Sequence, residues 1–310
     1  MKAGKPKDIL VKSALFFVFA AAVLFPFLSG EYYLHVAILA LMFAVLALSW
    51  DLAARAELVS FAHAGFFGLG AYVCALSFLK LGLPLPLCFL AAVLVAAGAA
   101  LALGYLTLPL TGIHFAIATL AFTQTLQVVA LRLPGLTGGA MGVTVPSLFG
   151  GARLFSYFLI FAFLLVLIGI SLYLERSPFR LAFTAMRTSE RVAAVLGVNV
   201  VRYRQLVFLV SAVFASLAGA FYVHYTSTTI PYEAFSLHIG VASLVMPVFG
   251  GLYSTAGPLL GAIVLYGGEE FLRTAISYGY LVVYGLILIM VILFLPKGIL
   301  GVARRWNFWR

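Results

Sequence analysis

The sequence predicts an all-α protein, a polytopic bundle of about ten transmembrane helices with both chain termini in the cytoplasm. Its 310 residues are 65% hydrophobic and 9% charged, with a mean hydropathy of +1.17, whereas soluble proteins contain about 25% charged residues. A transmembrane helix needs roughly 20 mainly apolar residues. Ten such helices use most of the chain, so we expect a single membrane domain, residues 1–310.

The apolar runs divide the chain into ten candidate spans, and we expect the first to be an uncleaved helix rather than a signal peptide. The expected ranges are 13–28, 34–50, 61–80, 86–109, 112–131, 156–174, 205–225, 238–251, 257–275 and 280–296.

Two regions interrupt this pattern. Residues 51–65 place charged side chains such as Asp51 and Arg55 beside an apolar run, and the span at 238–251 is short and contains Pro247. Broken or re-entrant helices are expected in both, because such backbone is tolerated at membrane depth only where protein or water covers it. An interfacial helix and a proline kink are the alternatives.

The distribution of basic residues predicts the orientation. With the N-terminus inside, nearly all of the 19 Lys and Arg residues fall in the inner segments, as the positive-inside rule requires. The exceptions are Lys80, Arg132, Arg153 and Arg273. Both termini are therefore expected in the cytoplasm, where their basic residues also attract anionic membrane lipid.

The span at 112–131 is the best candidate to line a path for a solute. Thr119, Thr123 and Gln127 recur every four residues and share one helix face, Gln124 is adjacent, and Phe115 extends the face. Polar groups beside apolar side chains suit a small solute that has both polar and hydrocarbon parts. Hydrogen bonding between helices is the alternative role.

The next segment, RLPGLTGGAMGVTVPSLFGG, is rich in turn-forming residues. It forms either a gate or a flexible loop on the outer side, and its Thr137, Gly138 and Gly139 belong to the candidate path.

Several function classes lack their signatures. No charged residue lies at the centre of a confident span, whereas ion-driven carriers usually keep one there. The chain has no HExxH pattern and no GxxxxGK[ST] phosphate loop. We therefore expect no catalytic residues, no metal, no bound cofactor and no nucleic-acid partner. Active transport by this chain would take its energy from another subunit.

The loop at 176–204 is basic and interrupts an otherwise apolar chain. Ser189 is placed to cap a short helix, Glu190 lies in its first turn, and Gly197 can close it in the left-handed conformation. Val192, Val195 and Leu196 share one face of this helix. Either the helix fits a groove on a cytoplasmic partner, or it lies on lipid headgroups.

Several motifs resemble, in order, those of one transporter family. They are GIHFAIATLAFTQTLQVV with TGGAMGV, then AMRTSERVAAVLGVNVVRYRQLVFLVSAVFASLAGAFY, then VFGGLYSTAGPLLGA. The sequence is similar to branched-chain amino acid ABC permeases of the M-type (LivM-type) over roughly residues 30 to 300.

The resemblance implies a multi-pass protein of a bacterial inner membrane and the other components of the system. In that family an extracytoplasmic binding protein delivers substrate, two paralogous permeases form the path, and two cytoplasmic ATPases bind ATP and dock on the loops. The corresponding coupling loop here is 176–204. With Ser189 at its start, the coupling residues are Arg187, Ser189, Glu190, Ala193, Ala194 and Gly197.

One segment departs from the family pattern. Relatives usually have glycines where this chain has Ala54 and Glu57. The cargo therefore stays open between branched-chain amino acids and urea, short amides or aromatic acids. An ion-coupled carrier or facilitator that acts without an ATPase is the alternative function.

Overall fold

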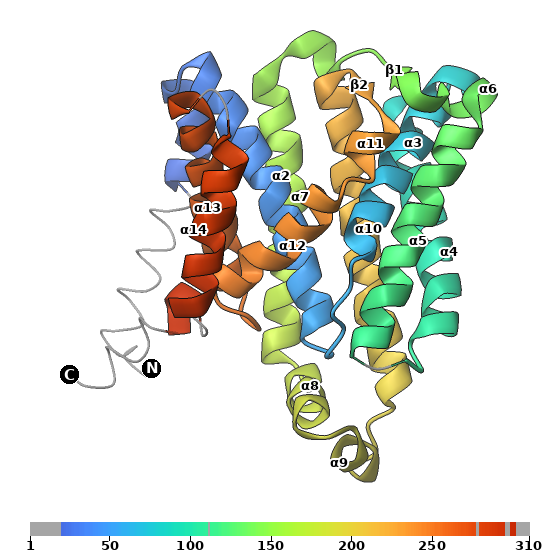
Figure 1. The fold of residues 1–310 in the computed structure, drawn as a ribbon, viewed down its shortest axis with the longest axis vertical. Coiled ribbons are helices and arrows are strands. Elements are labelled where there is room, and N and C mark those ends of the chain that lie inside the picture. The colour runs from blue at the N-terminus through green and yellow to red at the C-terminus, as the bar shows by residue number, and fades with distance from the viewer. Residues whose placement is uncertain (1–19, 111, 277–278, 295–297, 302–310) are drawn as a thin grey trace, which may run out of the picture.

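The computed structural model describes residues 20–110, 112–276, 279–294 and 298–301, which form a bundle of long helices (Figure 1). Two short strands, from distant parts of the sequence, pair at one end. The long helices are α2 (Glu31–Ala54), α3 (Ala62–Leu81), α4 (Leu85–Thr107), α5 (Ile113–Arg132), α7 (Arg153–Arg176), α10 (Val200–Thr226) and α13 (Ala256–Ala275). The shorter elements are α6 (Pro134–Thr137), η1 (Gly139–Met141), β1 (Val143–Thr144), η2 (Leu148–Gly151), α8 (Phe179–Thr188), α9 (Glu190–Val195), β2 (Thr228–Thr229), α11 (Pro231–Ala234), α12 (Leu237–Gly250) and α14 (Tyr280–Phe294).

Within the described residues, seven helices are long and apolar enough to cross a membrane: α2 to α5, α7, α10, and the combined stretch Pro231–Gly250. Helix α13 carries Glu269, Glu270 and Arg273, and α14 has 15 residues. Residues 20–28 are also helical. The prediction of an all-helical, multi-span protein is confirmed at this level.

Local sequence determines where one pair of helices turns. Gly82, in the left-handed conformation at φ 61°, ends α3, and Pro84 and Pro86 begin α4. Glycine adopts that conformation without steric cost, and proline is tolerated in the first turn of a helix because its missing N–H has no partner there. The connection between α3 and α4 is therefore short.

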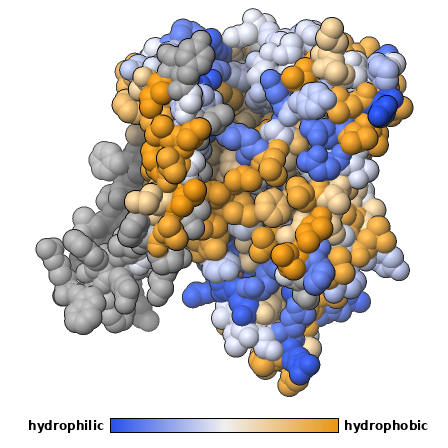
Figure 2. Space-filling view, in the orientation of Figure 1, coloured by the Kyte–Doolittle hydropathy of each residue, from blue (hydrophilic) through white to orange (hydrophobic). Residues whose placement is uncertain are grey.

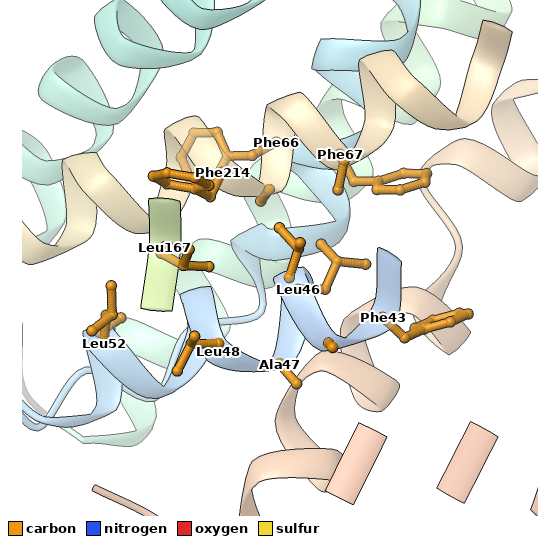
Figure 3. Packing of buried hydrophobic residues seen from close by; sticks show 14 of the residues in the cluster. Phe43, Leu46, Ala47, Leu48, Leu52, Phe66, Phe67, Leu167 and Phe214 are labelled. Carbon is orange, nitrogen blue, oxygen red and sulfur yellow. The ribbon is translucent and has the colours of Figure 1, made fainter. Parts of the chain in front are cut away.

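Helix α10 lies at the centre and packs against α2, α3 and α4. Figure 3 shows Phe66 of α3 next to Phe214 of α10, with Phe67 farther along and α2 side chains such as Leu46 below them. Gly70 of α3 has no side chain, and this lets α3 and α10 approach closely. A Cβ atom at this position would overlap the carbonyl oxygen of Ser216. Small residues of this kind are typical of helix contacts in membranes.

Of the two regions that the sequence marks as irregular, 51–65 contains a break, whereas 238–251 is the continuous short helix α12, and the break lies before it. Residues 55–61, the crossover, separate α2 from α3, and residues 227–236 separate α10 from α12. Helix α12 approaches the crossover, since a Cβ atom at Gly240 would lie 3.9 Å from the carbonyl oxygen of Phe61. Helix α12 has only 14 residues, contains Pro247 and ends before Gly251.

The two ends of the bundle differ in character. Helices α8 and α9 extend from the lower end in Figure 1, and the antiparallel pair β1–β2 lies at the upper end. We call these the basic end and the ladder end. Figure 2 shows a mainly apolar middle and hydrophilic residues gathered towards both ends, as expected for a bundle that crosses a bilayer.

Candidate functional site

The short helix α9 exposes an apolar face at the basic end. Val192, Val195 and Leu196 are 48%, 88% and 68% exposed. Gly197 has φ 81°, which confirms the predicted left-handed closure. Ser189 occupies the N-cap position, but its side chain makes no capping hydrogen bond. The predicted position of the helix is thus confirmed, while its capping by the Ser189 hydroxyl is wrong.

Packing of α8 holds α9 away from the bundle. Phe179 and Phe183 of α8 pack against the ring of Tyr203, with ring centroids 5.3 Å and 6.1 Å apart. Ala193 is buried, whereas Ala194 is exposed. The apolar face of α9 therefore projects outward from a fixed base.

Arg204 joins α9 to the crossover. It lies in the first turns of α10 and is 5% exposed. Its Nη2 donates to Glu190 Oε1 at 2.5 Å, and its Nε donates to the carbonyl oxygen of Ala56 at 3.2 Å. Because the buried guanidinium binds both acceptors, it fixes the distance between the Glu190 carboxylate of α9 and the Ala56 carbonyl of the crossover. Sequence analysis missed Arg204, because nothing in its neighbourhood indicates where its side chain points.

Two threonines of α5 bind the backbone of the crossover. The Phe61 N–H donates to Thr119 Oγ1, and Thr123 Oγ1 donates to the Phe61 carbonyl, both at 3.0 Å. Non-helical backbone inside a membrane needs such partners, since lipid offers none. The polar face that the sequence places on α5 is therefore paired with the crossover in this chain.

The other path candidates lie in different surroundings. Phe115 is buried, and Gln127 donates to the carbonyl oxygen of Pro231 at 3.4 Å, next to the second break. Gln124 is exposed on another face of α5. The structure thus brings Thr119, Thr123 and Gln127 to one buried face and leaves Gln124 outside it. That these residues line a path stays a prediction.

The glycine-rich segment at the ladder end is ordered by its own hydrogen bonds. Thr137 Oγ1 donates to the carbonyls of Ala130 at 2.5 Å and Leu133 at 2.9 Å, and accepts from the Gly139 N–H. Gly138 has φ 74°, and a Cβ atom there would overlap the carbonyl oxygen of Gly142. The segment is a packed turn with two short helical elements.

A buried charge network ties three chain segments together at the basic end. Asp51 Oδ2 accepts from Arg55 Nε at 2.9 Å. Arg55 also donates to Ser171 Oγ at 2.8 Å and to Glu175 Oε1 at 3.2 Å. Glu175 in turn accepts from the Thr255 N–H and hydroxyl, both at 2.7 Å. The network joins the ends of α2 and α7 to the segment at 251–255. The sequence drew attention to Asp51 and Arg55 but not to their partners.

Arg187 extends this network into α8. Its guanidinium lies 4.2 Å from the ring centroid of Tyr253, and the Tyr253 N–H donates to Asp51 Oδ1 at 2.6 Å. Burial, with a smaller contribution from Glu57, raises the pKa of the Tyr253 hydroxyl, so the ring stays neutral. The predicted coupling residues Arg187 and Glu190 thus both contact groups that reach the crossover or the end of α2.

Glu57 itself adopts a left-handed conformation, with φ 62°. This is one of the two positions where the resemblance described above leads us to expect glycine. Among the residues that the structure describes, no three His, Cys, Asp or Glu side chains gather closely enough to hold a metal ion.

Comparisons with known proteins agree on one family. The model of the branched-chain amino acid transport system / permease component family matches residues 32–293. The chain is 31% identical over 326 residues to the "High-affinity branched-chain amino acid transport system permease protein LivM" of Escherichia coli, covering 95% of this chain and 76% of that protein. It is 28% identical over 180 residues to the corresponding LivH protein of Escherichia coli, covering 54% of this chain and 58% of that protein. No solved structure matches.

Proposed function

We infer that this chain forms half of the translocation path of a binding-protein-dependent ABC importer, because it belongs to the family of branched-chain amino acid transport system permease components. It is a multi-pass inner-membrane protein, and the family is one of transport permeases rather than enzymes. The cargo that we propose is a branched-chain amino acid or a related small amide or acid.

We propose the full topology as follows. The single domain, residues 1–310, crosses the membrane ten times, and the basic end and both termini lie in the cytoplasm. The positive-inside rule supports this orientation, because α8 and α9 carry Arg180, Arg187 and Arg191. The ladder end then faces the extracytoplasmic binding protein.

Helix α9 is the proposed coupling helix. Its exposed apolar face, Val192, Val195 and Leu196, is the observation that carries this assignment. Large apolar side chains on a short projecting helix fit a groove on a partner protein. The partners are two ATPase subunits, which bind the ATP, so this chain itself needs no cofactor.

Arg204 is the proposed positioning residue that transmits the movement of α9. When the ATPases close, α9 moves with them, and Glu190 carries Arg204 along. Arg204 also holds the Ala56 carbonyl, so the pull reaches the crossover. The crossover is bound in turn to α5 through Thr119 and Thr123.

Helix α5 is where we place the path. Only 22% of the residues in the apolar 18-residue stretch of α5 are buried inside the protein. The exposed side of α5, which includes Gln124, is therefore free to face a paralogous permease subunit. A path between two such subunits allows α5 to contact the crossover on one face and the solute on another. Movement of the crossover would then shift α5 and change its contacts with the substrate.

The first experiment is purification of the tagged chain in mild detergent, with mass spectrometry of the proteins that accompany it. Two ATPases and a related permease are the expected companions. A lone protein whose uptake collapses with an ionophore would instead establish the ion-coupled carrier.

The second experiment measures substrate transported per ATP hydrolysed in proteoliposomes. Glu190→Lys places like charges together at Arg204, and Gly197→Pro cannot adopt the φ of 81° that closes α9. We expect both to reduce this ratio by about tenfold, the equivalent of roughly 1.4 kcal/mol of lost coupling. Glu233→Lys, exposed at the ladder end, is the matched control and should leave it unchanged. Normal coupling in both α9 variants would contradict the assignment.

A further inference from the structure

A cavity of about 650 Å³ opens at the basic end. It lies between the last turns of α2 and α7, helix α8 and the segment at 251–255. Its charged lining consists of Arg55, Arg176, Arg180, Arg187 and Glu175. Cavities of about 300–1,000 Å³ hold small ligands, so the space suffices for a compact polar group. Except for Arg187, none of the residues assigned to coupling or to the path lines it.

The charges of this lining are unbalanced. Arg55 is neutralised by Asp51 at 2.9 Å and Glu175 at 3.2 Å. Arg176, Arg180 and Arg187 have no carboxylate within 4.0 Å among the residues that the structure describes. Guanidinium groups that surround one space repel each other, so the cavity favours a bound anion.

The wall of the cavity holds one of these cations in position. Arg187 stacks on Tyr253 at 4.2 Å, and the Tyr253 backbone is anchored by Asp51. Thr184 and Ser254 also line the space, and their hydroxyls donate to the carbonyl oxygens of Arg180 at 2.8 Å and Gly251 at 3.0 Å. A preorganised guanidinium loses little freedom on binding and matches the geometry of phosphate oxygens, to which it donates two parallel hydrogen bonds.

The surroundings place the cavity at the depth of the lipid headgroups. Tyr173 in the last turn of α7 is 65% exposed, and Leu181 in α8 is 75% exposed. Exposed tyrosines are typical of the membrane–water interface, and Leu181 follows Arg180 directly in the chain. A headgroup phosphate is therefore within reach while its acyl chains remain in the bilayer.

We propose that this cavity is a phosphate-binding site, filled either by the headgroup of an anionic phospholipid or by a soluble phosphate compound. Arg176, Arg180 and Arg187 bind the phosphate oxygens. The ligand joins α8 to the ends of α7 and to the segment at 251–255, beside the base of α9. Binding is a property of the chain alone and is independent of the transport cycle.

The test is native mass spectrometry of the purified full-length chain, titrated with phosphatidylglycerol and, separately, with pyrophosphate. The cavity variant is Arg176→Gln/Arg180→Gln, in which both arginines are exposed, so folding is retained. The matched control is Arg191→Gln/Arg202→Gln, which removes the same charge from exposed positions at the same end. Thermal melting of each variant checks its fold.

We expect the cavity variant to bind phosphatidylglycerol about tenfold more weakly or worse, because it loses charge-assisted hydrogen bonds, while the control binds normally. That result assigns a lipid headgroup site. If pyrophosphate instead shows the same selective loss, the site takes a soluble phosphate. Equal losses in both variants, or no loss in the cavity variant with either ligand, would overturn the proposal. None of these readouts needs an ATPase, so they stand apart from the proposed transport function.

Discussion

Helices α3 and α4 are neighbours in the chain and in space, yet they are buried to different degrees. Helix α4 is the more hydrophobic of the two. Nevertheless, only 28% of the residues in its apolar 18-residue stretch are buried inside the protein, compared with 61% for α3. Helix α3 instead meets α10 through Gly70 against Ser216 and His63 against Ser211. Lipid tails are as apolar as leucine, so in this pair of helices the more hydrophobic member is the less buried one, and small and polar residues mark the contact of α3 with α10.

The largest effect should distinguish a buried from an exposed carboxylate on the same helix, α2. Asp51 is 0% exposed and pairs with Arg55, whereas Glu31 is 80% exposed and pairs with Arg153 at 2.6 Å. We expect Asp51→Asn to lower the free energy of unfolding by about 3–5 kcal/mol, because Arg55 loses its main counter-ion. Glu31→Gln should cost about 0–1 kcal/mol.

Both values come from denaturant titration of the purified protein in detergent. Equal losses for the two variants would mean that the network at the basic end is as hydrated as the surface pair. Burial of a carboxylate would then not predict how much its ion pair contributes to stability.

Two glycines make the comparison of α3 and α4 direct. A Cβ atom at Gly70 of α3 would overlap the Ser216 carbonyl, whereas nothing lies within 4 Å of one at Gly98 of α4. Gly70→Ala should therefore cost about 1–3 kcal/mol of unfolding free energy through overpacking. Gly98→Ala should stabilise by about 0.5–1 kcal/mol, because alanine favours the helix. Opposite shifts in melting temperature are the expected result, and shifts of the same sign would contradict it.

The two faces of α5 offer a finer distinction. Thr123 donates to the Phe61 carbonyl of the crossover, whereas exposed Thr125 bonds only to Ala121 of its own helix. Thr123→Val should cost about 1–3 kcal/mol, since it leaves a buried carbonyl with one partner fewer. Thr125→Val should stay within about 0.5 kcal/mol of wild type. Hydrogen exchange at residues 58–64 should rise only in the Thr123 variant, and unchanged exchange would contradict the role of Thr123.

The smallest effect concerns Ala54 and Glu57, the two positions where the family resemblance leads us to expect glycine. Glu57 has a positive φ, but Ala54 is the last residue of helix α2. Glu57→Gly should stabilise by about 0.5–1 kcal/mol, because a side chain is strained in the left-handed region. Ala54→Gly should cost a similar amount, since glycine weakens helices by about 0.5–1 kcal/mol. Melting temperatures that move in the same direction would show that the backbone at Glu57 is not strained.

Much of the bundle follows from patterns that read along the chain. The predicted spans at 61–80, 86–109 and 112–131 correspond closely to α3, α4 and α5. The short helix after Ser189 and its closure at Gly197 were predictable, because turn preferences act between residues a few positions apart, although the Ser189 hydroxyl does not cap the helix. The break around residues 55–61 was also predictable, since charged residues interrupt an apolar run there.

The partners of the buried polar groups were not predictable. Arg204, Glu175 and Thr255 carry no local signal that separates them from surface residues, and the polar face of α5 suited a solute as well as it suits the Phe61 backbone. Hydropathy cannot make this distinction, because it reports the cost of leaving water and not the group that replaces the water.

By itself, the sequence determined that the chain is a helical protein with several membrane spans, which loops are basic, and the family to which the chain belongs. These properties depend on composition and on short-range spacing. Only the tertiary structure decided that α9 is tied to the crossover through Arg204, and that Asp51 holds a backbone group 202 residues away. Such contacts arise because a buried charge must find a partner wherever packing brings one, and packing is set by the whole bundle.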